Sequence, residues 1–328
     1  MTGRRTLLLL VLAALALRAG DIPGPIDGRH EFRQTQTALA AWDIRERGLD
    51  LLHPRLPLFG DPWEAPMEYP VFQISAAAVD AASFWESLDL SIKLTALFYG
   101  ILCGVLLYAL CRELFEREST ALWVAAAFLL APFNVVWGTA SLIEYAAVSF
   151  SLGYLLFFLR TLRQPRLPPL LAAIALGSLA FLTKSTTAVL VGPPMAVCGL
   201  AFLFAERNPD LPFWRRAGVL LLLAGVPLCL GAAWVAHSDA IKQASIYTEW
   251  LSSESLEGWN FGTLAQRLDP ANWLLIGQRV ATQMINPLLV PFSLVGVVVT
   301  WRELRTLDAV RWTGALPRRF SSHQSCWC

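Results

Sequence analysis

Residues 30–38, which read HEFRQTQTA, follow the first apolar segment of the chain, and Asp27 stands three residues upstream. This short stretch holds carboxylate, imidazole, guanidinium and carboxamide groups, whereas most of the chain from there to residue 301 is apolar. Ionisable groups beside a membrane span are expensive and are usually functional. We expect the chemistry of the protein here. The alternative is an amphipathic helix that lies among the lipid headgroups.

Composition identifies the class of protein. The chain has 328 residues, of which 55% are hydrophobic and only 16% are charged, and its mean hydropathy is +0.50. A soluble domain carries roughly 25% charged residues, so we expect an integral membrane protein. The net charge of +1 argues against a nucleic-acid partner, which would require a basic face. The six cysteines show no metal-ligand spacing, and no metal site is expected from them.

Apolar runs divide the chain into membrane spans. Arg4 and Arg5 precede the run 6–17, which fits either a cleaved secretory signal or an uncleaved anchor. We expect an anchor, because more spans follow. Each later run approaches the ~20 residues that a bilayer requires. These runs are Leu90–Leu110, Ala121–Gly138, Ile143–Leu159, Leu167–Leu182, Thr187–Phe204, Ala217–Val235 and Gln283–Thr300. The predicted fold is an all-α integral membrane protein, a multi-span bundle of about eight transmembrane helices.

The placement of arginine predicts the orientation. Arginines gather in the loops 112–117, 160–166, 207–216 and 302–305. The positive-inside rule makes these loops cytoplasmic. Residues 20–88 and 236–282 then form two outer loops on the periplasmic or extracellular face of a cell (inner) membrane. We expect residues 1–301 to form one transmembrane region and residues 302–328 to form a cytoplasmic tail.

The first outer loop contains two amphipathic segments. Glu31–Arg47 has a helical pattern that Gly48 ends, and Val71–Trp85 is helical but too polar to span a membrane. A proline-rich, aromatic loop, 54–70, joins them. We expect two interfacial helices that cover the membrane surface.

Two further charged residues are predicted on the same side. Glu144 begins one span at its outer end, and Lys184 ends another. A lone lysine usually snorkels to the interface, but an outer cation runs against the positive-inside trend. Beside hydroxyl side chains, the compact charge of Lys184 suits a phosphate at headgroup depth. Glu68 lies near Trp63 and Tyr69, which could form a platform for a sugar.

These stretches resemble the motifs of a known superfamily. HEFRQ (30–34), LTKST (182–186) and EYPV (68–71) are similar to the Asp-Glu-x-Arg-Tyr, Leu-Thr-Lys-Gly-Pro and Glu-Lys-Pro-Pro-Leu motifs of the GT-C membrane glycosyltransferases. That superfamily includes the protein O-mannosyltransferases and the aminoarabinose transferase of lipid A. FRQTQTA (32–38) and PWEAPME (62–68) look most like an uncharacterised bacterial branch. The resemblance covers residues 1–300.

The resemblance implies an inverting transfer of a sugar from a polyprenyl-phosphate donor to a glycan, lipid or protein acceptor on the outer face. A carboxylate would act as the base, which typically contributes ~100- to 10,000-fold. His30 stands where the superfamily has its leading Asp, so the base could be Asp27 or Glu31. Arg33 and Lys184 would bind the lipid phosphate. Sugar, acceptor or a divalent cation would be positioned by His30, Gln34, Glu68 and Glu144.

Two departures leave other functions open. Ser185-Thr186 replaces Gly-Pro, and the end of the chain, 318–328, matches nothing in the pattern of these longer enzymes. We therefore expect a C-terminally truncated or frame-shifted product, for which an inactive remnant is one alternative. The other is a transporter or flippase of a lipid-linked substrate. Transporters place polar residues near the middle of the membrane, whereas the charged residues singled out here gather at the outer ends of the spans.

Overall fold

The computed structural model describes residues 3–26, 30–58, 60–61, 63–85, 87–115, 117–204 and 211–284. These ranges contain helices and a single β-bridge, between Arg55 and Glu64, but no strand. The expected all-α class is confirmed. The predicted tail, 302–328, and nearly all of the predicted span 283–300 lie outside the described residues.

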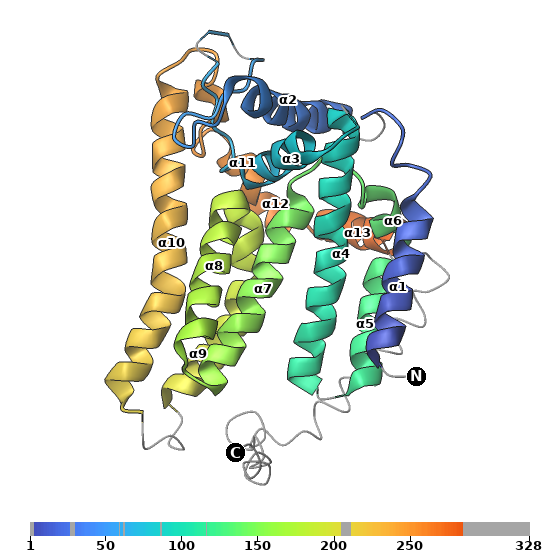
Figure 1. Ribbon diagram of the computed structural model, residues 1–328. Helices are drawn as coiled ribbons and strands as arrows, with labels where there is room; N and C mark the ends of the chain where they lie inside the picture. Colours follow the sequence, from blue (N-terminus) through green and yellow to red (C-terminus); the bar gives the residue numbers. More distant parts are fainter. Residues whose placement is uncertain are drawn as a thin grey trace, which may run out of the picture.

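The helices form a bundle with a cap at one end (Figure 1). The bundle consists of α1 (Gly3–Arg18), α4 (Leu88–Phe115), α5 (Glu118–Leu129), α7 (Glu144–Arg163), α8 (Leu167–Ala188), α9 (Gly192–Phe204) and α10 (Phe213–Gln243). The remaining α-helices are α2 (Glu31–Arg47), α3 (Val71–Ala82), α6 (Pro132–Trp137), α11 (Glu257–Phe261), α12 (Leu264–Leu268) and α13 (Pro270–Arg279). The short helical segments are the 3₁₀-helices η1 (Val189–Val191) and η2 (Glu249–Leu251) and the π-helix η3 (Val280–Met284).

Four helical stretches of the described chain are long and apolar enough to cross a membrane: Leu88–Phe115, Glu144–Arg163, Leu167–Phe204 and Phe213–Gln243. A multi-span bundle is therefore supported, and the number of about eight spans stays a prediction. One predicted element needs correction. The run 121–138 is broken into α5 and α6 just before Pro132, because proline lacks an N–H and disfavours helical geometry in the preceding residue. The predicted runs 167–182 and 187–204 require a turn at 184–186, and α8 is interrupted there, at Lys184, where two helices meet.

Arg18, the last residue of α1, satisfies the broken end of α5. Its Nη2 donates to the carbonyl oxygens of Leu129, at 2.9 Å, and Asn134, at 2.8 Å. The last carbonyls of a helix have no intrahelical partner, and a basic side chain is a favourable substitute there. The Asn134 side chain also accepts a hydrogen bond from the Tyr145 hydroxyl at 2.7 Å. The α5–α6 break is thus held by α1 and α7.

Close packing of α8 against α7 and α10 depends on a glycine and a proline. A Cβ at Gly177 would lie only 2.9 Å from Pro227 Cγ and from Tyr154 Cε2, so a larger residue would push the helices apart. Pro227 lies inside α10 and cannot donate to the carbonyl of Leu223, four residues earlier. The Tyr154 hydroxyl donates to that oxygen instead, at 2.7 Å. A tyrosine of α7 therefore compensates for the proline.

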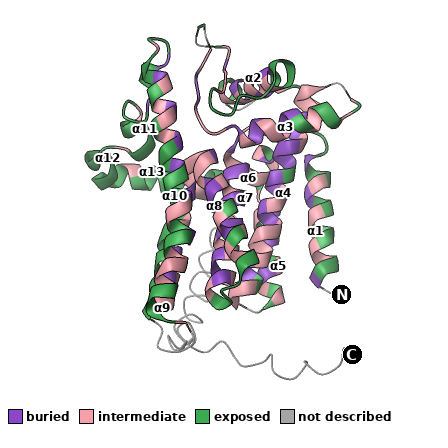
Figure 2. Ribbon diagram, turned by 60° about the vertical axis from the view of Figure 1, so that its left-hand side comes forward, coloured by how far each residue is buried: buried purple, intermediate pink, exposed green. Residues whose placement is uncertain are grey.

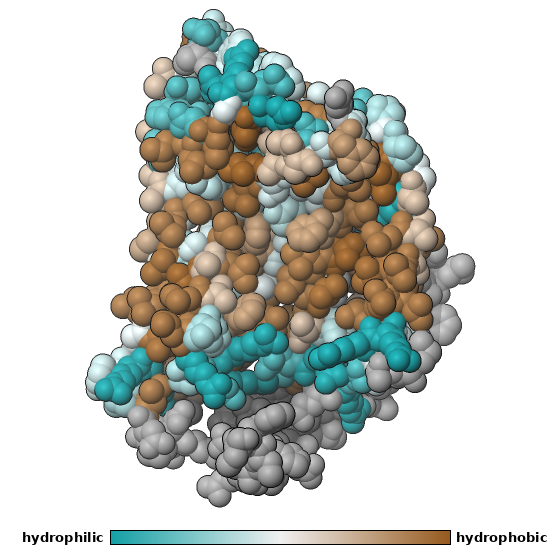
Figure 3. Space-filling model, viewed as in Figure 1, coloured by the Kyte–Doolittle hydropathy of each residue, from teal (hydrophilic) through white to brown (hydrophobic). Residues whose placement is uncertain are grey.

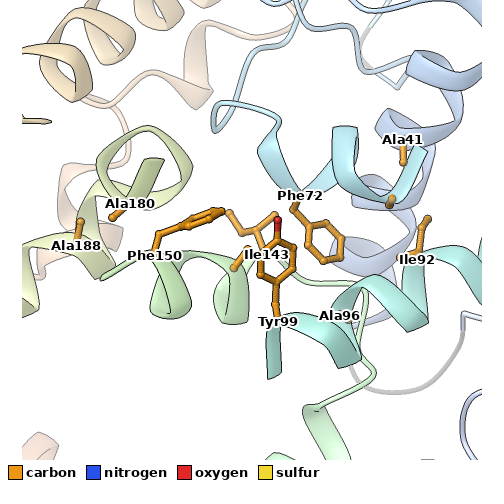
Figure 4. Packing of buried hydrophobic residues seen from close by; sticks show 11 residues of the cluster. Ala41, Phe72, Ile92, Ala96, Tyr99, Ile143, Phe150, Ala180 and Ala188 are labelled. Carbon is orange, nitrogen blue, oxygen red and sulfur yellow. The ribbon is translucent and has the colours of Figure 1, made fainter. Parts of the chain in front are cut away.

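The cap consists of α2 and α3, which cross the end of the bundle (Figure 1). An apolar cluster joins them to α4, α7 and α8 (Figure 4). Its largest members are Phe72, Ile92, Tyr99, Ile143 and Phe150. The bounds predicted for the first cap helix match α2, and the second ends at Ala82 instead of residue 85, because Ser83 adopts an extended conformation. That these helices lie in the membrane interface stays a prediction.

The surface repeats the pattern of a membrane protein. A hydrophobic band separates two hydrophilic ends (Figure 3), and buried residues gather where α4, α7 and α8 meet the cap (Figure 2). At the end opposite the cap, Glu113 pairs with Arg160, at 3.2 Å, and with Arg163. The C-terminal end of α10 lies at the same end as α2 and α3 (Figure 1), as expected if the two predicted outer loops share one face.

The predicted orientation can be tested with single cysteines at the exposed positions Asp50 and Gln164, introduced after the native cysteines are replaced by serine or alanine. The positive-inside rule places Asp50 outside and Gln164 inside. A membrane-impermeant maleimide applied to intact cells should label the cysteine at 50 and reach the one at 164 only after the cells are opened. The opposite labelling would end the proposed orientation.

Candidate active site

A hollow lies between the cap and the bundle, with about 510 Å³ of atom-free space when its open mouth is included. We call it the first hollow. From α2 it is lined by Arg33, Gln36, Thr37 and Ala40, whose spacing of three, four and seven residues places them on one helix face. The loop 54–70, the start of α3 and the turn before α7 complete the lining. Segments distant in the sequence thus converge here.

Arg33 joins α2 to the proline-rich loop. Its Nη2 lies 3.2 Å from Glu68 Oε1, and its Nη1 donates to Gln36 Oε1 at 2.8 Å. The Arg33 side chain is 40% exposed and that of Glu68 is 22% exposed. The guanidinium therefore remains accessible from the hollow. Two residues singled out in the sequence, 35 positions apart, form one ion pair.

Lys184 and Glu144 form a second ion pair beside the first hollow. Lys184 Nζ lies 2.8 Å from Glu144 Oε1, and Glu144 lines the hollow. The backbone of Lys184 leaves helical geometry, with φ −162° and ψ 93°. Two residues before this kink, the carbonyl of Leu182 accepts a hydrogen bond from the N–H of Tyr69 at 3.1 Å. The kink in α8 thus contacts both the loop and α7.

The other candidates from the sequence lie elsewhere. Gln34 is buried, and its Oε1 accepts a hydrogen bond from the Ser141 N–H at 2.8 Å. It therefore anchors the turn that leads to α7. His30 has a left-handed backbone, with φ 57°, and its ring lies 5.6 Å from that of Trp137. Glu31 is exposed in the first turn of α2, and neither it nor His30 lines the first hollow. Asp27 lies outside the described residues.

Sequence reasoning missed Asp43 and Arg55. Asp43 is 2% exposed, and its Oδ2 lies 3.2 Å from the Nε of Arg55, which lines the first hollow. The other oxygen, Oδ1, lies 3.6 Å from the Nε of Arg47. Asp43 is one of the polar residues of Glu31–Arg47, the segment predicted to be an interfacial helix. The spacing of four residues between Asp43 and Arg47 is the one sequence signal of a salt bridge on this helix. No sequence pattern indicates that Arg55, in the loop, pairs with Asp43.

Arg47 and Arg55 also line a second, more polar hollow, with about 560 Å³ of atom-free space including its mouth. In it, His53 Nδ1 lies 3.3 Å from Glu64 Oε2. Asp50 accepts hydrogen bonds from the backbone N–H groups of His53 and Leu52, which hold the pKa of this carboxyl below its usual range. Hydrogen bonds to the charged form have this effect. The two hollows share Arg55.

The proline-rich loop rests on the C-terminal part of α10. The rings of Tyr69 and Trp234 meet edge to face, with centroids 4.9 Å apart, a favourable aromatic geometry. The Ser238 hydroxyl donates to the carbonyl of Pro66 at 2.6 Å. Because this loop carries Glu68 and Arg55, its contacts with α10 help fix the position of both side chains.

A divalent cation was one expectation from the sequence. Within the described ranges, no three His, Cys, Asp or Glu side chains are grouped to hold a metal ion. The two carboxylates that line the first hollow are already paired with cations, Glu68 with Arg33 and Glu144 with Lys184. The described residues therefore do not fit a metal site.

Residues 81–233 match the family described as dolichyl-phosphate-mannose-protein mannosyltransferase. The matched segment includes α4 to α8, most of α10, and both Glu144 and Lys184. This segment, a little under half of the chain, is similar to that family of GT-C glycosyltransferases. The resemblance noted on the sequence motifs is thereby confirmed. No curated protein sequence matches the chain.

A solved structure with a similar arrangement is that of the archaeal oligosaccharyltransferase AglB from Archaeoglobus fulgidus, in complex with an inhibitory peptide and a dolichol-phosphate. The two sequences are 14% identical, the TM-score is 0.43, and the match covers 93% of this chain. It covers 37% of AglB, so this chain spans little more than a third of that protein.

The role of Gln34 can be tested by Gln34→Met, which keeps the shape but removes the acceptor for the Ser141 N–H. A buried donor left without a partner costs about 1–3 kcal/mol, so the variant should unfold at a lower temperature than the wild type. Thermal unfolding of the purified protein in detergent measures this, with Gln278→Met, on the exposed face of α13, as the matched control. If both variants unfold like the wild type, Gln34 is not a structural anchor.

Proposed function

We propose that this GT-C protein transfers a sugar from a polyprenyl-phosphate donor to a hydroxyl of an acceptor at the first hollow. The observation that carries the proposal is the convergence of two ion pairs, Arg33–Glu68 and Lys184–Glu144, on one hollow at the capped end of a membrane bundle. Arg33, Glu68 and Lys184 come from three separate motifs, and the matched family uses a lipid-phosphate-linked mannose. The acceptor would be a glycan, a lipid or a protein.

The cations are proposed to bind the phosphate of the donor. In the structure, Arg33 and Lys184 are each balanced by a carboxylate, because a partly buried charge without a partner is costly. A donor phosphate would exchange with these carboxylates and form charge-assisted hydrogen bonds in their place. When the bond between the sugar C1 and the phosphate oxygen breaks, the leaving phosphate gains negative charge. Cations already in position stabilise that charge.

The acceptor hydroxyl attacks C1 from the side opposite the phosphate, which inverts the sugar, and loses its proton to a carboxylate. We retain Asp27 and Glu31 as the proposed bases, since they belong to the motif that contains Arg33. Glu31 and Arg33 are two positions apart and project from different sides of α2. For Glu31 to act, the acceptor would therefore have to approach from the exposed side of the helix. Glu68 and Glu144, which line the hollow, would position sugar and acceptor.

We place the reaction on the outer, periplasmic face of a cell membrane. Arg160 and Arg163 lie in the last turn of α7, and Arg166 lies in the loop between α7 and α8. This loop is at the end of the bundle opposite the cap (Figure 1). Under the positive-inside rule that end is cytoplasmic. The hollow would then open on the outer side, where a polyprenyl phosphate presents its sugar at headgroup depth.

The first test concerns Lys184. Binding of polyprenyl-phosphate mannose to the full chain in lipid nanodiscs should be lost in Lys184→Ala and kept in part in Lys184→Arg, since arginine keeps the charge with a different shape. The matched control is Lys242→Ala, which removes a lysine paired with Asp239 at the end of α10 and should leave donor affinity unchanged. If Lys184→Ala binds the donor with normal affinity, Lys184 does not bind the phosphate and only extends its charge to the membrane interface.

The second test concerns the base. Asp27→Asn and Glu31→Gln keep size and hydrogen bonding but remove the charge. We expect at least one of them to lower turnover of a radiolabelled lipid-linked sugar in membranes by ~100-fold or more, without lowering expression. Glu46→Gln, at an exposed position of the same helix, is the control. Normal turnover in both variants would exclude Asp27 and Glu31 as the base. The turnover of Glu68→Gln and Glu144→Gln would then be measured in the same way.

A further inference from the structure

The first hollow is lined by two residues with buried oxygens that lack hydrogen bonds, Gln73 and Glu144. Within the described part of the chain, five buried side-chain oxygens have no hydrogen-bond partner, and two of them belong to residues that line this hollow. Of the other three residues, one forms an ion pair with a lining residue, one precedes a lining residue in the sequence, and one precedes Lys184, the ion-pair partner of Glu144. The five atoms are Asp43 Oδ1, Gln73 Oε1, Ser141 Oγ, Glu144 Oε2 and Thr183 Oγ1. An unsatisfied buried polar atom is uncommon in a native protein and calls for a specific explanation, such as a ligand or an ordered water.

Two of these residues, Gln73 and Glu144, line the hollow itself. Gln73 lies in the first turn of α3, between the loop that carries Glu68 and the apolar cluster, and it is 7% exposed. Its Oε1 has no partner. Glu144 uses Oε1 for Lys184 and leaves Oε2 without one. Leaving such an acceptor unsatisfied costs about 1–3 kcal/mol, so these oxygens are expected to gain partners when the hollow is filled.

The chemistry of these atoms restricts what can fill the hollow. Amide and carboxylate oxygens are acceptors, so they need a ligand that presents hydrogen-bond donors. A phosphate diester presents only acceptors and belongs beside Arg33 and Lys184. A sugar presents several hydroxyl donors, and in a lipid-linked donor it is attached directly to the phosphate. Gln73 and Glu144 line the same hollow as Arg33, and Glu144 is paired with Lys184, so a sugar attached to a phosphate at these cations would enter the same hollow.

We propose that Gln73 and Glu144 bind hydroxyl groups of the donor sugar, and that Gln73 is a residue that determines sugar specificity. This rests on the proposed function and assigns the part of the donor that each side of the hollow recognises. Binding of the phosphate to Lys184 would release Glu144 Oε1 as well, so both oxygens of Glu144 become available as the sugar enters. A site built to bond a hydroxyl strongly rejects an analogue that lacks it.

The experiment measures binding of three kinds of ligand to the full chain in nanodiscs. The first is polyprenyl phosphate without sugar, the second is the same carrier with mannose, glucose or galactose, and the third is the carrier with deoxy analogues of the best-bound sugar. In the wild type, at least one sugar should increase affinity about tenfold over the bare carrier, and one deoxy analogue should lose about tenfold. Gln73→Met, which keeps the volume without the amide, should lose the same factor for the sugar-bearing carrier. It should bind the bare carrier normally and no longer distinguish that deoxy analogue.

Each outcome decides a separate point. Bare carrier that binds normally to Gln73→Met shows that the variant is folded, and Gln278→Met serves as the matched control. The inference is overturned if no sugar adds affinity in the wild type, if Gln73→Met binds like the wild type, or if it weakens the bare carrier as much as the sugar-bearing one. The wild-type measurements with deoxy analogues do not depend on any variant. Failure of the wild type to bind even the bare carrier would instead overturn the proposed function.

Discussion

The ion pair between Lys184 and Glu144 is the constraint around which the capped end of the bundle is arranged. A lysine at the end of an apolar helix needs a partner or an aqueous route, since a charge facing lipid is expensive. Here the partner is Glu144, the first residue of the neighbouring helix α7, and its Oε1 lies 2.8 Å from Lys184 Nζ. At Lys184 the backbone of α8 kinks, and α7, α8 and the loop that carries Glu68 meet there. Glu144 and this loop then line the hollow together with Arg33 of α2.

Elsewhere in the bundle, side chains satisfy backbone groups wherever a helix is interrupted. Arg18 bonds the carbonyls at the end of α5, and Tyr154 bonds the carbonyl that Pro227 leaves without a donor. In a bilayer no water is present to do this, so interrupted helices survive only where neighbouring elements supply the missing partner. The same requirement explains why Gln34, a polar residue of the motif, bonds the backbone of the turn before α7.

The hollow itself departs from this rule in one respect. Its lining cations, Arg33 and Arg55, are paired, but two of its buried oxygens, Gln73 Oε1 and Glu144 Oε2, have no hydrogen-bond partner. A site with balanced charges can exist empty without a large electrostatic penalty. A surplus of free acceptors, by contrast, favours a ligand that brings hydroxyl groups. The arrangement suits a donor with two chemically different parts, a phosphate for the cations and a sugar for the acceptors.

The sequence by itself determined the helical membrane class, the bounds of α2, and the end of the bundle at which the charged motifs gather, because hydrophobic length, helix-stop residues and arginine placement are local properties of the chain. It also indicated Arg33, Glu68, Glu144 and Lys184 as site residues. Tertiary structure alone decided which of them pair, that Gln34 faces the backbone, and that Glu31 is exposed. It alone brought Arg55 to the buried Asp43 and left Gln73 without a partner. Those features depend on contacts between segments far apart in the chain, and no local pattern encodes a partner that distant.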